Sequence, residues 1–200
     1  MTAIKLCGIR RPEEIELINS LKPEYAGFVF WDKSRRYIEA AAAAELKNRL
    51  DPSIRAVGVF VDEEPDKVAE LLNSGTIDMA QLHGKEDEEY IKRLRSMASK
   101  PIIKAFRIKA EEDLKAAESC SAEFLLLDAG AGDGAVFDWS WLKAFGRPYI
   151  LAGGLNTENV AEAVIKLKPY GVDVSSGIET EGVKDKIKMQ AFLETVRRIG

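Results

Sequence analysis

Short apolar runs rich in Val, Ile and Phe alternate along the chain with longer segments in which apolar residues recur at helical spacing. The runs predict strands at residues 4–7, 25–30, 55–61, 78–82, 102–107, 124–128, 149–152 and 171–175. The segments after them predict helices at residues 12–21, 39–50, 65–74, 86–97, 110–118, 139–145, 157–166 and 185–199. Eight such pairs in 200 residues, about 25 residues per pair, are typical of a short eight-stranded parallel α/β barrel.

We expect one (β/α)8 TIM-barrel domain over residues 1–200, because the sequence contains no linker, no low-complexity stretch and no shift in composition. An open doubly wound sheet is the alternative, since repeated strand–helix units do not prove that the sheet closes. Local signals agree with three helix starts. Pro12 and Pro65 stand where a first turn tolerates a missing N–H, and residues 156–158 offer a cap before Val160.

The composition excludes several classes of protein. A hydrophobic content of 46% with 31% charged residues describes a chain that can bury a core. The net charge is −4, and no basic block could coat nucleic acid. Cys7 and Cys120 lie far apart and there is one histidine, so neither a disulfide scaffold nor a zinc site is indicated. With no apolar run of about 20 residues and no signal peptide, we expect a cytoplasmic protein without membrane segment.

Two glycine-rich loops follow the last two predicted strands, at the carboxyl ends where barrels of this kind build their sites. Gly153 and Gly154 follow the seventh strand, while Ser175, Ser176 and Gly177 end the eighth. Glycines let the backbone approach a ligand closely, and free N–H groups at a helix start attract anions. Each loop alone could be a tight turn, but two in adjacent units favour phosphate binding by these five residues.

A thiol and a carboxyl group end two other predicted strands. Cys7 closes the first, and Lys5 points to the same face by strand alternation, where its ammonium would favour the thiolate. Asp128 ends a very apolar run, in which a carboxyl group can hold a proton to donate. A lone cysteine is more often a small buried hydrophobe, and such an aspartate is as often a cap. Opposite a phosphate cradle, however, the two groups predict proton shuttling on a sugar phosphate, without metal or cofactor, as in an isomerase.

Other polar residues near the mouth are less specific. Gln81 and His83 end the fourth strand, and for the single histidine a structural role beside Gln81 is favoured over a binding role. Arg36 lies in a polar loop, where its planar fork could bind a carboxylate of an anionic substrate. Residues 130–135 match the glycine fingerprint of dinucleotide-binding folds, but no helix follows at once and the next strand ends without an acidic residue. We interpret them as a loop, and Cys120 as structural.

Nearly the whole chain resembles the phosphoribosylanthranilate isomerase family of tryptophan biosynthesis. The matching segments are residues 5–8, 26–30, 34–38, 58–61, 81–84, 137–139, 151–155 and 171–179. Each is weak alone, but their order and spacing together are specific. The resemblance implies a barrel that converts N-(5′-phosphoribosyl)anthranilate to 1-(2-carboxyphenylamino)-1-deoxyribulose 5-phosphate by an Amadori rearrangement. The phosphosugar substrate is then the expected binding partner. The oligomeric state, monomer or homodimer, is left open.

The resemblance also implies roles for individual residues. Cys7 corresponds to the general base, Asp128 to the general acid and Arg36 to the arginine that binds the anthranilate carboxylate; Gln81 and His83 are candidate substrate contacts. The phosphate would rest on Gly153, Gly154, Ser176 and Gly177. Two departures stand out: Arg35 replaces the proline that commonly precedes the arginine, and residues 129–134 differ from the usual Gly-Thr-Gly type of turn.

Three other functions compete with this interpretation. A related barrel rearranges an aminoimidazole carboxamide ribotide with two aspartates and two phosphate sites, but here the first strand ends in Cys7 and the third lacks a Gly-Gly cradle. Indole-glycerol-phosphate synthase would need a catalytic lysine further along the barrel, and no such lysine can be placed. A binding barrel without activity needs only the glycine loops and Arg36. The presence of Cys7 and Asp128 at strand ends favours the enzyme.

Overall fold

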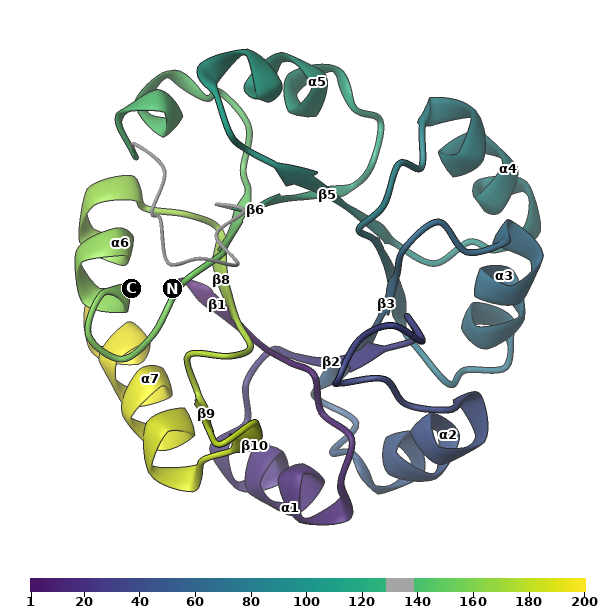
Figure 1. The fold of residues 1–200 in the computed structure, drawn as a ribbon, viewed down its shortest axis with the longest axis horizontal. Helices are drawn as coiled ribbons and strands as arrows, with labels where there is room; N and C mark the ends of the chain where they lie inside the picture. Colours follow the sequence, from purple (N-terminus) through teal and green to yellow (C-terminus); the bar gives the residue numbers. More distant parts are fainter. Residues whose placement is uncertain (129–138) are drawn as a thin grey trace.

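The computed structural model of the chain describes residues 1–128 and 139–200. Parallel strands close into a barrel surrounded by helices (Figure 1). The strands are β1 (Ala3–Cys7), β2 (Tyr25–Val29), β3 (Arg55–Phe60), β4 (Met79–Leu82), β5 (Ile102–Arg107), β6 (Phe124–Asp128), β7 (Ile150–Ala152) and β8 (Gly171–Val174). The predicted fold class is confirmed. The open-sheet alternative is wrong, because β8 pairs with β1 and brings Asp173 opposite Lys5.

The helices alternate with the strands as predicted. They are α1 (Pro12–Leu21), α2 (Ala40–Arg49), α3 (Pro65–Asn73), α4 (Glu88–Met97), α5 (Leu114–Ser119), α6 (Val160–Leu167) and α7 (Lys186–Ile199), with the 3-10 helices η1 (Glu111–Asp113) and η2 (Trp139–Ala144). Pro12 and Pro65 open α1 and α3. Before α6, the Asn156 side chain accepts hydrogen bonds from the backbone N–H groups of Glu158 and Asn159, so this helix begins at Val160 and not at residue 157. None of the helices in the described part of the chain is both long and apolar enough to cross a membrane.

An antiparallel hairpin between β8 and α7 is an element that the hydrophobic pattern does not predict. Its strands are β9 (Glu179–Thr180) and β10 (Val183–Lys184), joined by Glu181 and Gly182. Both turn residues have positive φ, 52° and 78°, as two-residue hairpin turns require. Strands of two residues are too short to show an alternation of apolar and polar positions, so the pattern carries no signal for them.

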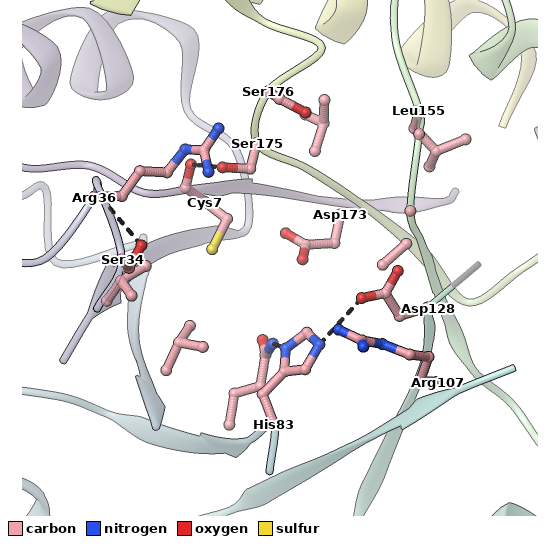
Figure 2. Close-up of a pocket in the computed structure, with 17 residues that line it drawn as sticks. Cys7, Ser34, Arg36, His83, Arg107, Asp128, Leu155, Asp173, Ser175 and Ser176 are labelled. Carbon is pink, nitrogen blue, oxygen red and sulfur yellow. Dashed lines mark hydrogen bonds and ion pairs between the residues drawn. The ribbon is translucent and has the colours of Figure 1, made fainter. Parts of the chain in front are cut away.

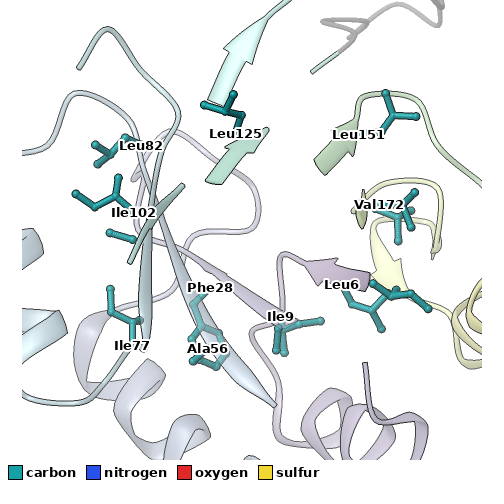
Figure 3. Close-up of a cluster of buried hydrophobic side chains, with 14 of the residues drawn as sticks. Leu6, Ile9, Phe28, Ala56, Ile77, Leu82, Ile102, Leu125, Leu151 and Val172 are labelled. Carbon is teal, nitrogen blue, oxygen red and sulfur yellow. The ribbon is translucent and has the colours of Figure 1, made fainter. Parts of the chain in front are cut away.

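Strand alternation divides the buried residues into two layers. On β1, Ile4 and Leu6 point outward into the cluster that packs against the helices, part of which is shown in Figure 3. Ala3, Lys5 and Cys7 alternate with them and face the inside of the barrel. Toward the amino ends of the strands, apolar side chains fill the interior of the barrel, among them Tyr25, Val57, Met79, Ile103, Leu126 and Ile150. Polar chemistry is therefore concentrated near the carboxyl ends of the strands.

Candidate active site

A cavity of about 290 Å³ lies at the carboxyl ends of the strands. Every strand of the barrel contributes a residue to its wall: Cys7, Val29, Val59, Gln81, Arg107, Asp128, Ala152 and Asp173. The loops after the strands add Ser34, Arg36, His83, Gly153, Gly154, Leu155, Ser175 and Ser176. All predicted site residues except Gly177 therefore line one cavity, at the end of the barrel where such folds carry their active sites.

Cys7 ends β1, and its sulfur points into the cavity (Figure 2). Burial raises the pKa of the Cys7 thiol. The Lys5 ammonium opposes this rise, as the sequence analysis expected, whereas the Asp173 carboxylate adds to it. Because burial outweighs Lys5, the thiol and not the thiolate is the resting form at neutral pH.

A buried ion pair accompanies Cys7. Lys5 Nζ donates to Asp173 Oδ1 at 2.9 Å, and the Lys5 side chain is only 1% exposed. Burial lowers the pKa of Lys5, but Asp173 and Cys7 together outweigh burial and the net shift is upward, so the ammonium stays charged. Asp173 was not singled out from the sequence, although an acidic residue at an inward position of an otherwise apolar strand was a usable signal.

Asp128 ends β6 and lies across the cavity from Cys7 in Figure 2. His83 Nε2 is 3.1 Å from Asp128 Oδ2, and Gln81 Nε2 is 2.9 Å from His83 Nδ1. When the Gln81 amide donates to Nδ1, the histidine carries its proton on Nε2 and donates it to Asp128. His83 is thus bonded to Gln81, as its structural interpretation requires, and also lines the cavity.

Arg107 is a cavity residue that the sequence analysis missed. It ends β5 and stands opposite Asp128 in the strand register. Figure 2 shows its guanidinium on the same side of the cavity as the Asp128 carboxylate. Since it closes a predicted strand, the strand-end rule that selected Asp128 selects Arg107 as well.

The two neighbouring arginines after β2 occupy different places. Arg36 lines the cavity with a side chain that is 19% exposed, and its Nε and Nη2 donate to Glu179 Oε1 and Oε2 at 2.6 and 2.8 Å. Arg35 also donates to Glu179 Oε2, at 2.9 Å, but its side chain is 62% exposed and does not line the cavity. Of the two, Arg36 is the arginine that can face a ligand.

Gly8 leaves the space through which the Arg36 side chain passes. A Cβ atom at this position would lie 2.3 Å from Arg36 Cδ and 3.2 Å from Ser175 Oγ. The backbone of Gly8 also has a φ of +83°, which L side chains rarely adopt. Any larger residue would therefore displace Arg36 and strain the turn after Cys7.

The predicted phosphate loops both reach the rim of the cavity. Gly153 and Gly154 have φ values of 87° and 67°, a left-handed backbone that favours glycine. Ser176 is exposed at this rim. Ser175 Oγ donates to the backbone carbonyl of Cys7 at 3.0 Å, which ties this loop to β1.

Gly177 is the one predicted site residue that does not line the cavity. It forms a β-bridge with Asn156, and a Cβ atom on it would lie 1.9 Å from the carbonyl oxygen of Leu155. This close approach holds the loops after β7 and β8 together. Its predicted contact with the phosphate stays a prediction.

A family model for N-(5′phosphoribosyl)anthranilate (PRA) isomerase matches residues 4–195. The chain belongs to this family. The N-(5′-phosphoribosyl)anthranilate isomerase of Endomicrobium trichonymphae is 46% identical over 98% of both chains, and that of Acetivibrio thermocellus is 44% identical over 98% of this chain and 96% of the relative. The resemblance drawn from the motifs is confirmed.

Solved structures of PRA isomerases superpose on the whole barrel. The enzyme from Thermus thermophilus is 35% identical, with a TM-score of 0.89 over all of both chains. Another PRA isomerase structure, in complex with reduced 1-(o-carboxyphenylamino)-1-deoxyribulose 5-phosphate, is 34% identical with a TM-score of 0.89 over 99% of this chain and 100% of that chain. Both fit the family assignment.

The remaining sequence interpretations concern the segment after β6, Cys120 and metal binding. The glycine-rich segment 130–135 and the divergent turn 129–134 lie outside the described residues. Cys120 is buried outside the cavity wall, where its sulfur accepts a hydrogen bond from the backbone N–H of Ala122 at 3.4 Å. Within residues 1–128 and 139–200, no group of three His, Cys, Asp or Glu side chains could hold a metal ion.

Proposed function

We propose that the chain catalyses the Amadori rearrangement of N-(5′-phosphoribosyl)anthranilate to 1-(2-carboxyphenylamino)-1-deoxyribulose 5-phosphate, a step of tryptophan biosynthesis. The observation that carries the proposal is that Cys7 and Asp128 line a single cavity, in a chain that belongs to the PRA isomerase family. A related structure that holds the reduced product supports the same assignment.

Asp128 is the proposed general acid. It protonates the ring oxygen, and the furanose opens to an iminium ion. His83 Nε2, at 3.1 Å from Asp128 Oδ2, positions the carboxyl group and stabilises the carboxylate left after the proton has moved. Gln81 holds the histidine ring through Nδ1.

Cys7 is the proposed general base. Its thiolate removes the C2′ proton of the iminium ion, giving an enolamine, which then tautomerises to the ketone of the product. Because burial raises the pKa of the Cys7 thiol, the reactive thiolate is a minor form at neutral pH, and we expect the rate to rise as the pH increases. Protonation of the ring oxygen breaks the ring C–O bond, the later steps are proton transfers, and no outside oxidant or reductant is involved, so the proposed mechanism needs no metal or cofactor.

The binding roles follow the charge of the substrate. Gly153, Gly154, Ser175 and Ser176 offer backbone N–H and hydroxyl groups at the rim for the phosphate, with Gly177 supporting them. Arg36 binds the anthranilate carboxylate, while Gln81 and His83 contact the sugar between these two anchors.

We further propose a single-domain cytoplasmic enzyme whose partner is this small phosphosugar, with no nucleic acid or membrane. The family's place in amino-acid biosynthesis supports this.

The test is turnover of freshly made phosphoribosylanthranilate by the purified protein, followed as loss of anthranilate-type fluorescence. We expect Cys7→Ala and Asp128→Asn to lower kcat by about 100-fold or more, while the reduced product analogue still binds. Cys120→Ala is the matched control, a buried cysteine removed away from the cavity, and should keep full activity.

Two outcomes would contradict the proposal. Turnover retained by either cavity variant would reject the acid or base role of that residue. Comparable turnover of the aminoimidazole carboxamide ribotide, assayed alongside, would reject the substrate assignment.

A further inference from the structure

Glu179 joins three cationic side chains at the edge of the cavity. Its carboxylate is 4% exposed and accepts hydrogen bonds from Arg36, Arg35 and Lys184, the last from Nζ to Oε1 at 2.8 Å. Lys184 is itself buried and also donates to the backbone carbonyl of Ser175 at 2.9 Å. The β9–β10 hairpin supplies both Glu179 and Lys184, so this small element brings a buried carboxylate to the arginine loop after β2.

Electrostatics keep Glu179 ionised. Burial disfavours its charged form, but the hydrogen bonds and positive charges of Arg36 and Lys184 together outweigh burial and lower the pKa of Glu179 to about 2. The carboxylate then faces two guanidinium groups, which stay charged, and Lys184, whose pKa burial lowers. The two arginines alone leave an excess of positive charge at this edge of the cavity. An anionic group of a ligand would be attracted there.

The geometry of Arg36 leaves donors for such an anion. Glu179 takes one edge of the guanidinium, through Nε and Nη2, and thereby fixes its plane. The other terminal nitrogen, Nη1, donates to no acceptor among the described residues. A guanidinium held in this way can donate from its terminal nitrogens to a ligand. Because its orientation is already fixed, little rotational freedom is lost when the ligand binds.

We propose that Glu179 is a positioning residue for carboxylate recognition: it orients Arg36 so that the free edge of the guanidinium faces the aromatic carboxylate of the substrate. The inference rests on the proposed function and extends it to a residue 143 positions away from Arg36 in sequence. A merely structural role, in which Glu179 only fastens the hairpin, makes a different prediction, because it would not depend on Arg36 or on the carboxylate.

The experiment compares two ligands, reduced 1-(o-carboxyphenylamino)-1-deoxyribulose 5-phosphate and the same molecule without the carboxylate. In Glu179→Gln we expect the dissociation constant of the first ligand, and KM, to rise about tenfold or more. Binding of the second ligand and kcat should change less than about threefold. In an Arg36→Met background, the same substitution should have no further effect on either ligand.

Controls separate folding from positioning. Glu162→Gln removes an exposed glutamate that pairs with Lys166 and should leave both affinities unchanged. If thermal melting shows that Glu179→Gln does not fold, Glu179→Asp keeps the charge but shortens the reach, and should weaken only the carboxylate-bearing ligand.

Equal weakening of both ligands, or an undiminished effect in the Arg36→Met background, would overturn the positioning role. Failure of the proposed function is visible separately. A wild-type protein without turnover that still discriminates between the two ligands through Glu179 would reject the reaction and leave the positioning role intact.

Discussion

The two walls of the cavity are built on different interactions. Around Cys7, the strands β1 and β8 and the β9–β10 hairpin contribute buried ion pairs, Lys5 with Asp173 and Lys184 with Glu179. Around Asp128, the strands β4 and β6 contribute a chain of hydrogen bonds from Gln81 through His83, whose side chain is 25% exposed. The residue assigned as base therefore sits among buried ion pairs, and the residue assigned as acid sits beside a more accessible hydrogen-bonded chain and the guanidinium of Arg107.

This difference indicates how each wall should respond to an amino-acid substitution. Removing one member of a buried ion pair leaves an uncompensated charge, which costs stability as well as function. Removing one member of a partly exposed hydrogen-bonded chain lets water replace it. We therefore expect substitutions in the wall around Cys7 to lower both activity and the free energy of unfolding. Substitutions in the hydrogen-bonded wall around Asp128 should lower activity with little loss of stability.

The largest effect is expected for Lys5→Met, which leaves Asp173 buried without its cation. The free energy of unfolding should fall by about 3 kcal/mol or more, measured by urea denaturation. The pKa of Cys7 should rise further, because the ammonium that opposes burial is lost, so the alkaline rise in kcat/KM should move to higher pH.

Asp173→Asn should shift the pKa of the Cys7 thiol in the opposite direction. It removes the carboxylate that raises the pKa of Cys7, so the rise in kcat/KM should move to lower pH. Shifts of the two pH profiles in the same direction would show that these charges do not control Cys7.

An intermediate effect is expected for Arg36→Met, compared with Arg35→Met. Loss of the charge-assisted contacts of Arg36 should raise KM by about 10- to 100-fold. The exposed Arg35 does not reach the cavity, and its loss should change KM by less than about twofold. Steady-state kinetics measures both, and equal effects would mean that the two guanidinium groups share the ligand.

The smallest effect is expected for His83→Asn, on the hydrogen-bonded wall. We expect kcat to fall about tenfold, because Asp128 loses the donor that positions it. The free energy of unfolding should change by less than about 1 kcal/mol. A loss of stability as large as that of Lys5→Met would remove the distinction between the walls.

The strand-end residues could be predicted from sequence because two local rules are enough to place them. Period-two alternation sets which residues of a strand face inward, and parallel strands bring their carboxyl ends to one edge. These rules bring Cys7, Gln81 and Asp128 into one cavity, and they would also have selected Arg107. The barrel itself follows from counting strand–helix pairs.

The features that the sequence did not predict depend on contacts between residues far apart in the chain, or on opposing effects on one pKa. No local pattern links Glu179 to Arg36, because a two-residue strand has no periodicity and the partners are far apart in sequence. The effect of Lys5 on Cys7 has the expected sign, but only the degree of burial shows that it is outweighed. The glycine at position 177 is visible in sequence, whereas its close contact with Leu155 is not.

The crowding around Gly8 limits how this barrel could be redesigned. Position 8 is the immediate neighbour of Cys7, so substitutions there would be a direct way to change the surroundings of the thiol. Here a new side chain would meet Arg36 Cδ before it met any substrate. Mutagenesis aimed at a differently charged aromatic substrate should therefore hold this glycine constant and diversify the opposite wall.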